Sequence, residues 1–196
     1  MINILILYHS TSGHTEKMAH CIARGVESIE NAQAILRTVP NVSANTEISE
    51  HSFPTEGAPY ASLDDLAHCD GLALGSHAHF GTMSAPMTHF WDGTSPLWLT
   101  RSLINKIAGA FTKAGTMHGG QETTLTSMMT PLLHHGMLIM GLPYSEPDLN
   151  QTTTGGTPYG PSHYAGVKSN HPITAEEKNL CIAFGKRLAS LSALMR

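Results

Sequence analysis

The chain has 196 residues, of which 41% are hydrophobic and 13% are charged, and its formal net charge is -4. This composition is too apolar for a disordered chain, and no run approaches the ~20 apolar residues of a membrane-spanning helix. Lysine and arginine form no cluster, which argues against nucleic acid or an anionic membrane as partners. The three cysteines lie far apart and outside any C-x-x-C spacing, so we expect free thiols and a cytoplasmic protein.

Short apolar runs alternate along the chain with segments of helical periodicity. The runs predict five strands, at 2–8, 34–39, 71–75, 106–112 and 136–142. The periodic segments predict helices at 14–30, 62–70, 85–92 and 122–135, and a final helix after a capping-box pair, Thr174 and Glu177. Two stretches, 40–60 and 143–173, are rich in polar residues, glycine or proline and lack periodicity, so we expect long loops there.

Strands that alternate with helices predict a parallel sheet with helices on both faces. Five such units fit the five-stranded doubly wound order better than a dinucleotide-binding fold or a barrel. We therefore expect an α/β fold in which residues 1–196 form one domain with long loop insertions. In such a sheet, ligands bind beyond the carboxyl ends of the strands.

The segment YHSTSGHT, residues 8–15, joins the first predicted strand to the first predicted helix. Backbone N–H groups at the start of a helix attract anions. Hydroxyl donors in this loop come from Ser10, Thr11, Ser12 and Thr15. Gly13 allows close approach of the backbone, His14 lies beside it, and the loop contains no carboxylate. The segment therefore predicts a phosphate-binding loop.

The chemistry of the loop favours one kind of phosphate. It lacks both G-x-G-x-x-G and G-K-[ST], the motifs that bind dinucleotides and polyphosphates. Its only basic residues are histidines, so a phosphate monoester fits better than a polyphosphate with magnesium. A simpler interpretation is that a hydroxyl caps the helix, but one hydroxyl is enough for a cap and the loop has four.

The pattern S-x-S-G-x-T after the first strand is similar to the phosphate loop of flavodoxins. Five further motifs resemble those of the WrbA-type NAD(P)H:quinone oxidoreductases: FGTMSAPM at 80–87, PLW at 96–98, HGGQETTLTS at 118–127, LLHHGM at 132–137 and GGTPYG at 155–160. They occur in order over nearly the whole chain. The resemblance implies a flavodoxin-like fold, bound FMN, and two-electron reduction of quinones with NADH or NADPH as co-substrate.

The resemblance also implies roles for individual residues. Residues 10–15 would hold the FMN phosphate. The residues implied around the flavin ring are Ala78, His79, Phe80, Gly81, Lys113, Ala114, Gly115, Thr116, Gly119 and His134. Trp98 would wall the substrate site and would come from a neighbouring subunit of a homotetramer. The residues implied in catalysis are His134, Trp98 and His79.

The chain departs from the family pattern after the third strand, where it has HAHFGT at 77–82 and the family usually reads P-T-R-F-G-N. Positive charge near the reduced flavin could instead come from Lys113, His79, His118 or His134.

Two other functions stay open: an electron carrier of flavodoxin type, and an FMN-binding relative without quinone turnover that acts as a sensor or assembly protein. The net charge of -4 is mild for a carrier, whose docking face is usually strongly acidic. We expect no metal site despite 13 histidines, because none of them falls in a zinc-ligand motif.

Overall fold

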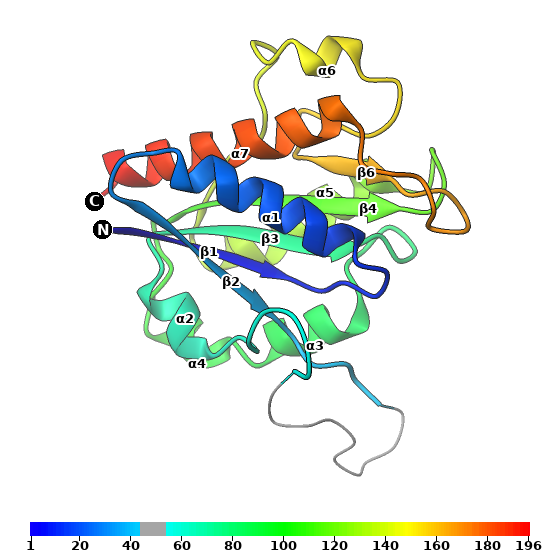
Figure 1. Cartoon of the computed structure of the whole chain (residues 1–196). Coiled ribbons are helices and arrows are strands. Elements are labelled where there is room, and N and C mark those ends of the chain that lie inside the picture. The colour runs from blue at the N-terminus through cyan, green and yellow to red at the C-terminus, as the bar shows by residue number, and fades with distance from the viewer. Residues whose placement is uncertain (44–53) are drawn as a thin grey trace.

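A parallel sheet organises the chain, as the computed structural model shows for residues 1–43 and 54–196 (Figure 1). The strand order β2-β1-β3-β4-β5 confirms the doubly wound prediction. The strands are β1 (Ile2–Tyr8), β2 (Ala32–Thr38), β3 (Gly71–His77), β4 (Ile107–Ala114), β5 (Leu138–Ile139) and β6 (Ser162–Tyr164). Of the loop expected at 40–60, residues 44–53 lie outside the described residues.

The fifth position of the sheet differs from the prediction, because two short strands share it. β5 pairs with the first two residues of β4, and β6 pairs with the last three. Between them the chain leaves the sheet over residues 140–161, which include the short helix α6 (Asp148–Gln151). Strands of two and three residues are too short to produce a period of two. The predicted strand at 136–142 was therefore too long, and β6 was missed within the aperiodic stretch.

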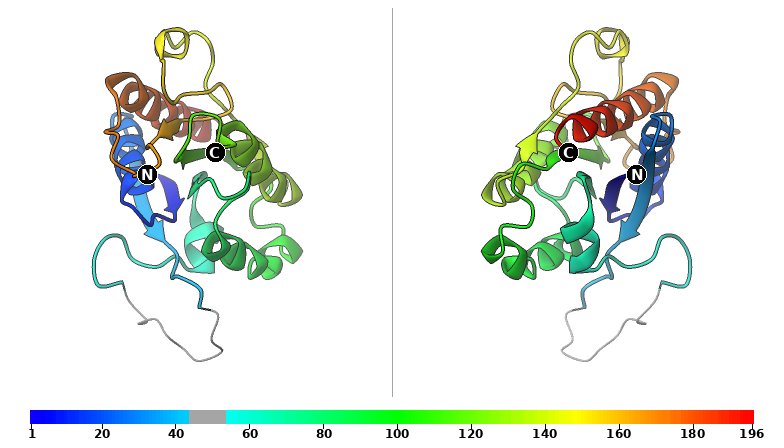
Figure 2. Two further views of the ribbon diagram at one scale, coloured as in Figure 1. Left: turned by 90° about the vertical axis from the view of Figure 1, so that its right-hand side faces the viewer. Right: turned by 90° about the vertical axis from the view of Figure 1, so that its left-hand side faces the viewer.

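Helices cover both faces of the sheet, and Figure 2 shows the two layers from either end. One face carries α1 (His14–Glu27) and α7 (Ala175–Leu194), and the other carries α2 (Leu63–His68), α3 (Ala85–Asp92), α4 (Ser95–Leu99) and α5 (Gln121–His134). Along β1, Ile4 and Ile6 belong to the core under α1 and α7, whereas Leu5 and Leu7 belong to the opposite core. This alternation is expected of a parallel strand that is buried on both faces.

The predicted helices all form, with ends that shift by a few residues. The first helix ends at Glu27 rather than at residue 30, and the last begins at Ala175 with both bonds of the expected capping box. Helix α4 was not predicted, because its five residues are too few to show a helical period. Among the described residues, no helix combines the length and the hydropathy needed to cross a membrane.

The carboxylate of Glu177, which is 1% exposed, joins the start of α7 to the segment that precedes it. Its Oε1 accepts backbone N–H bonds from Gly155 (2.8 Å) and Tyr164 (3.2 Å). Its Oε2 accepts from the Thr174 N–H (2.9 Å) and faces Nδ1 of the buried His163 (2.8 Å). Burial raises the pKa of Glu177, but these bonds outweigh that effect and lower the pKa overall, so the carboxylate is ionised at neutral pH.

We predict that Glu177→Ala lowers the free energy of unfolding by about 3–5 kcal/mol, because it leaves His163 and three backbone N–H groups without their acceptor. Urea denaturation followed by circular dichroism measures the change. Glu176→Ala, on the same turn and partly exposed, serves as the matched control and should cost less than about 1 kcal/mol. Equal losses in the two variants would contradict the role given to Glu177.

Candidate functional site

The candidate site lies at the carboxyl ends of β1, β3 and β4. The order of the sheet reverses between β1 and β3, since β1 is followed in sequence by β2 on one side and lies next to β3 on the other. A crevice forms at such a switch point because the connections after the two strands leave in opposite directions. Three loops border it: residues 9–13 after β1, 78–84 after β3 and 115–120 after β4.

Two hydroxyls where β1 leads into α1 make no hydrogen bond among the described residues. Helix α1 begins after Gly13, which has the left-handed φ of 76°, and no side chain caps the helix. Ser10 Oγ and Thr15 Oγ1 are buried, and neither has a partner among the described residues. The capping interpretation of the hydroxyls therefore does not hold in this structure. Buried hydroxyls without partners beside an uncapped helix start are the donors that a phosphate requires.

Histidine lies on the inner side of the same loop. The ring of His14 is 6% exposed, with Nδ1 3.2 Å from Ser12 Oγ and Nε2 3.3 Å from the carbonyl oxygen of His171. The ring of His163, from β6, stacks on it with centroids 5.0 Å apart. His163 could not be placed here from the sequence, because nothing in a three-residue strand indicates which face a side chain occupies.

The loop after β3 presents an aromatic side chain at its tip. The backbones of His79 and Thr82 exchange two hydrogen bonds (2.9 and 3.1 Å), and Phe80 and Gly81 between them have positive φ values of 51° and 78°. This is the geometry of a two-residue type I′ turn. Phe80 is 97% exposed, with the His79 ring against its edge at 4.7 Å. Such an exposed aromatic ring at a crevice suits contact with a flat partner.

Helix α5 holds this turn in place through a hydrogen bond. Ser127 Oγ donates to the Gly81 carbonyl oxygen (3.2 Å), and the Ala78 N–H donates to the Lys113 carbonyl oxygen (2.7 Å). The loops after β3 and β4 are therefore held together. Helix α5, like α1, follows a left-handed glycine, Gly120 (φ 80°), and no side chain caps it.

A buried lysine and a cluster of histidine rings lie behind these loops. Lys113 is 9% exposed, and burial lowers its pKa. The ring of His77 lies 5.5 Å from that of His9 and 6.2 Å from that of His79, and its Nδ1 has no partner among the described residues. Burial, followed by His9, Lys113 and His79, lowers the pKa of His77 to about 4. His9 and His77 were not among the predicted site residues, although the alternation of His77 with His79 in the sequence was visible.

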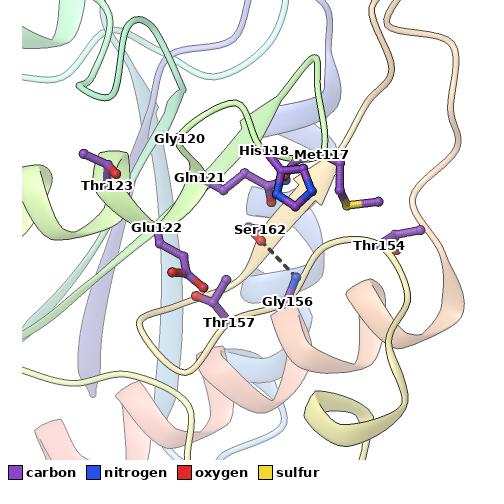
Figure 3. A pocket seen from close by; sticks show the side chains of 10 residues that line it. All are labelled: Met117, His118, Gly120, Gln121, Glu122, Thr123, Thr154, Gly156, Thr157 and Ser162. Atoms are coloured by element: carbon purple, nitrogen blue, oxygen red, sulfur yellow. Dashed lines mark hydrogen bonds between the residues drawn. The ribbon is translucent and has the colours of Figure 1, made fainter.

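Of the other predicted residues, Ala114 is the last residue of β4, and Gly115, Thr116 and Gly119 lie in the loop that follows it. Next to them is a cavity of about 340 Å³, which we call the α5 cavity (Figure 3). Its lining residues are Met117, His118, Gly120, Gln121, Glu122, Thr123, Thr154, Gly156, Thr157 and Ser162. They come from the loop after β4, from the start of α5, and from residues 154–162, which lead into β6. In this last segment the Gly156 N–H donates to Ser162 Oγ (2.9 Å). The sequence did not predict this cavity.

His134 and Trp98 lie at the other end of the sheet. His134 is the last residue of α5, which begins at the carboxyl edge and runs back for 14 residues, or about 20 Å. Trp98, in α4 and 55% exposed, lines a cavity of about 460 Å³ together with His134, His135 and Trp91. Within one chain the structure therefore does not bring His134 or Trp98 to the phosphate loop. The flavin contact that the resemblance implies for His134 therefore stays a prediction.

Comparison with known proteins agrees with this geometry. Residues 2–145 match the family model described as NADPH-dependent FMN reductase. The chain belongs to this family. A protein from Chromohalobacter salexigens named NAD(P)H dehydrogenase (quinone) is 39% identical to this chain over 198 residues. The match covers 98% of each chain.

Solved structures show the same fold as this member of the FMN reductase family. A flavodoxin, WrbA-like protein from Agrobacterium tumefaciens matches all of both chains with a TM-score of 0.73 and 21% identity. A flavodoxin from the domain Archaea matches with a TM-score of 0.66 and 22% identity, covering 98% of this chain and 99% of the other. The flavodoxin-like α/β prediction is thereby confirmed.

In this member of the FMN reductase family, the loop after β1 and the start of α1 fit the phosphate of FMN. The unpartnered hydroxyls of Ser10 and Thr15 and the uncapped start of α1 provide neutral donors, and no carboxylate lies in the loop. The loops after β3 and β4 could hold the ring, with Phe80 offering a flat apolar face. Within the described part of the chain, no group of three or more histidine, cysteine, aspartate or glutamate side chains is arranged to hold a metal ion.

We predict that His77 stays neutral until the pH approaches about 4. NMR titration of the histidine ring signals should show one that moves near this pH and is missing from the His77→Gln variant. Because its folded-state pKa lies below the ordinary value of 6.5, the unfolded chain binds this proton first. The contribution of His77 to stability is therefore lost as the pH falls from 6.5 towards 4. A His77 signal that titrates at 6.5 or above would contradict the buried, neutral ring.

Proposed function

We propose that this protein is an FMN-dependent NAD(P)H:quinone oxidoreductase that reduces quinones by two electrons. The observation that carries the proposal is the pair of buried, unpartnered hydroxyls, Ser10 and Thr15, at an uncapped helix start at the switch point of the sheet. The family match and the relative named NAD(P)H dehydrogenase (quinone) extend it from the cofactor to the reaction.

Within this proposal, residues 10–15 bind the phosphate through hydroxyls and backbone N–H groups. The other residues that hold FMN are Ala78, His79, Phe80, Gly81, Lys113, Ala114, Gly115, Thr116 and Gly119. The position of these residues supports this assignment, because the loops after β3 and β4 border the same crevice as the phosphate loop.

The chemistry that bound FMN supplies is the transfer of a hydride equivalent from NAD(P)H to a quinone. The protein contributes orientation and charge. Lys113 is the buried cation of the site, and His77 adds little charge at neutral pH because burial lowers its pKa to about 4. Phe80, which packs at a steep angle against the ring of His79, is the exposed ring that borders the substrate.

His134 and Trp98 act across a subunit boundary in the homotetramer that we propose. Both line one cavity at the amino edge of the sheet, where no flavin bound to the same chain reaches them. Trp98 is exposed, although a large aromatic side chain is usually covered. In the tetramer, the amino edge of one copy faces the flavin crevice of the next, so that Trp98 and His134 wall the quinone site of a neighbour.

The same proposal includes a single domain over residues 1–196 and a cytoplasmic location. A single sheet has a hydrophobic core on each face, and helices from both halves of the chain contribute to these cores. This arrangement supports a single domain. Cys21, Cys69 and Cys181 are free thiols, as is typical of a reducing compartment.

We predict that Ser10→Ala and Thr15→Val each weaken FMN binding about 10- to 100-fold, because each removes a hydrogen bond to a charged phosphate. Quenching of flavin fluorescence on titration with the protein measures Kd. Thr126→Val, which changes an exposed hydroxyl of α5, should leave Kd unchanged. Riboflavin, which lacks the phosphate, should bind the variants and the unaltered protein equally. Unchanged FMN affinity in both loop variants would contradict the phosphate site.

We predict that the FMN-loaded protein oxidises NADH or NADPH with benzoquinone as acceptor and elutes as four copies in light-scattering chromatography.

Trp98→Ala should lower kcat/KM for the quinone about tenfold while FMN content is retained, since it removes an aromatic wall. Leu194→Ala, which removes another exposed apolar side chain, is the control. A flavin that is reduced by dithionite but not by NAD(P)H would favour the electron carrier or the sensor instead.

A further inference from the structure

The neighbours of His14 determine which of its ring nitrogens carries hydrogen. Nε2 lies 3.3 Å from the carbonyl oxygen of His171, and a carbonyl can only accept a hydrogen bond. The hydrogen of the neutral ring is therefore on Nε2, and Nδ1 is left as an acceptor. Ser12 Oγ, 3.2 Å from Nδ1, must then donate its hydrogen to the ring. In this state the Ser12 hydroxyl hydrogen points towards His14 and is not available to a ligand in the loop.

A proton added to Nδ1 reverses this bond. Nδ1–H then donates to Ser12 Oγ, and the hydroxyl hydrogen of Ser12 is released to point elsewhere. The backbone carbonyl of His171 keeps its bond to Nε2–H in both states, so the ring need not move. One proton thus produces two changes in the phosphate loop: a positive charge on His14 and a free O–H donor on Ser12.

The surroundings of His14 keep it neutral when the loop holds no anion. Burial lowers its pKa most, and the neighbouring His163, Lys17 and Lys113 lower it further, while the bond to the His171 carbonyl opposes them. These groups come from three elements: Lys17 from α1, Lys113 from β4 and His163 from β6. The Glu177 carboxylate is already bonded to His163 and to three backbone N–H groups, and the His171 ring lies edge-on to Tyr164 instead.

We propose that His14 takes up a proton when the phosphate of FMN enters the loop, and that this proton turns the Ser12 hydroxyl from the histidine ring to the phosphate. The inference rests on the proposed function, because it assumes that FMN is the ligand. A dianion next to an imidazole favours its charged form, and burial strengthens that preference. His14 is therefore the group that supplies positive charge in a loop that otherwise binds the phosphate with neutral donors.

Calorimetry of the full chain tests the proposal directly. FMN is titrated into the protein at about pH 7 to 8, above the second phosphate pKa of about 6, in two buffers of different ionisation enthalpy. We expect uptake of up to one proton per FMN, and a Kd that rises by up to tenfold per pH unit within the window between the free and the bound pKa of His14. Riboflavin, without a phosphate, should bind with no proton uptake.

Two variants and one spectrum separate the proposal from a merely structural role of His14. His14→Asn should bind FMN without proton uptake and with a Kd that does not depend on pH, whereas His20→Asn, at an exposed position of the same helix, should behave like the unaltered protein. The ring ¹⁵N signals of His14 in the unaltered protein need no variant: Nδ1 should be bare before FMN is added and protonated afterwards.

FMN binding without proton uptake, or uptake that persists in His14→Asn, would overturn this inference and leave the proposed function intact. Failure of FMN to bind at any pH would overturn both together.

Discussion

The carboxyl edge of the sheet depends on the hydrogen bonds of one buried carboxylate, that of Glu177. It accepts hydrogen bonds from the N–H groups of Gly155, Tyr164 and Thr174, and it holds the buried ring of His163. These partners belong to the segment before β6, to β6 itself and to the start of α7. An ionised group at this depth persists only because every lone pair that faces the protein is used. Through His163, which stacks on His14, the same carboxylate also fixes the back of the phosphate loop.

Helix capping separates the parts of this edge that stabilise the fold from the parts that bind. The helices that follow the outer strands β2 and β6 have complete capping boxes, at Ser62 and Thr174. The helices that follow the central strands β1, β3 and β4 begin at Gly13, Ser84 and Gly120, and none of the three has a side-chain cap. Uncapped N–H groups cost stability unless a ligand or water satisfies them. The short helices α4 and α6 also lack a side-chain cap, so it is the grouping of three such starts after β1, β3 and β4 that agrees with a binding site at this edge.

The sequence predicted the parts of the molecule whose pattern is local. A strand buried on both faces is a continuous apolar run, and the capping box at Thr174 is visible in four residues, so the sheet order and the final helix could be predicted. The split fifth strand, helix α4 and the position of His163 depend on contacts between distant segments, which no short period records. For His134, the resemblance implied a flavin contact but did not say in which copy of the chain, and only the structure shows that a helix of 14 residues carries it to the opposite edge.

The exposed aromatic side chains explain why the proposed site needs more than one copy. Phe80 is 97% exposed at the carboxyl edge and Trp98 is 55% exposed at the amino edge, so each end of the sheet presents a large apolar surface to solvent in a single chain. Water contact with such surface is unfavourable, and both surfaces are removed from solvent when the amino edge of one copy meets the carboxyl edge of another. If the two copies are related by a two-fold axis, each contributes both edges and one contact covers all four surfaces. In the tetramer that we propose, the flavin crevice of one copy and the Trp98 cavity of another would form one active site, so that catalysis as well as stability would depend on assembly.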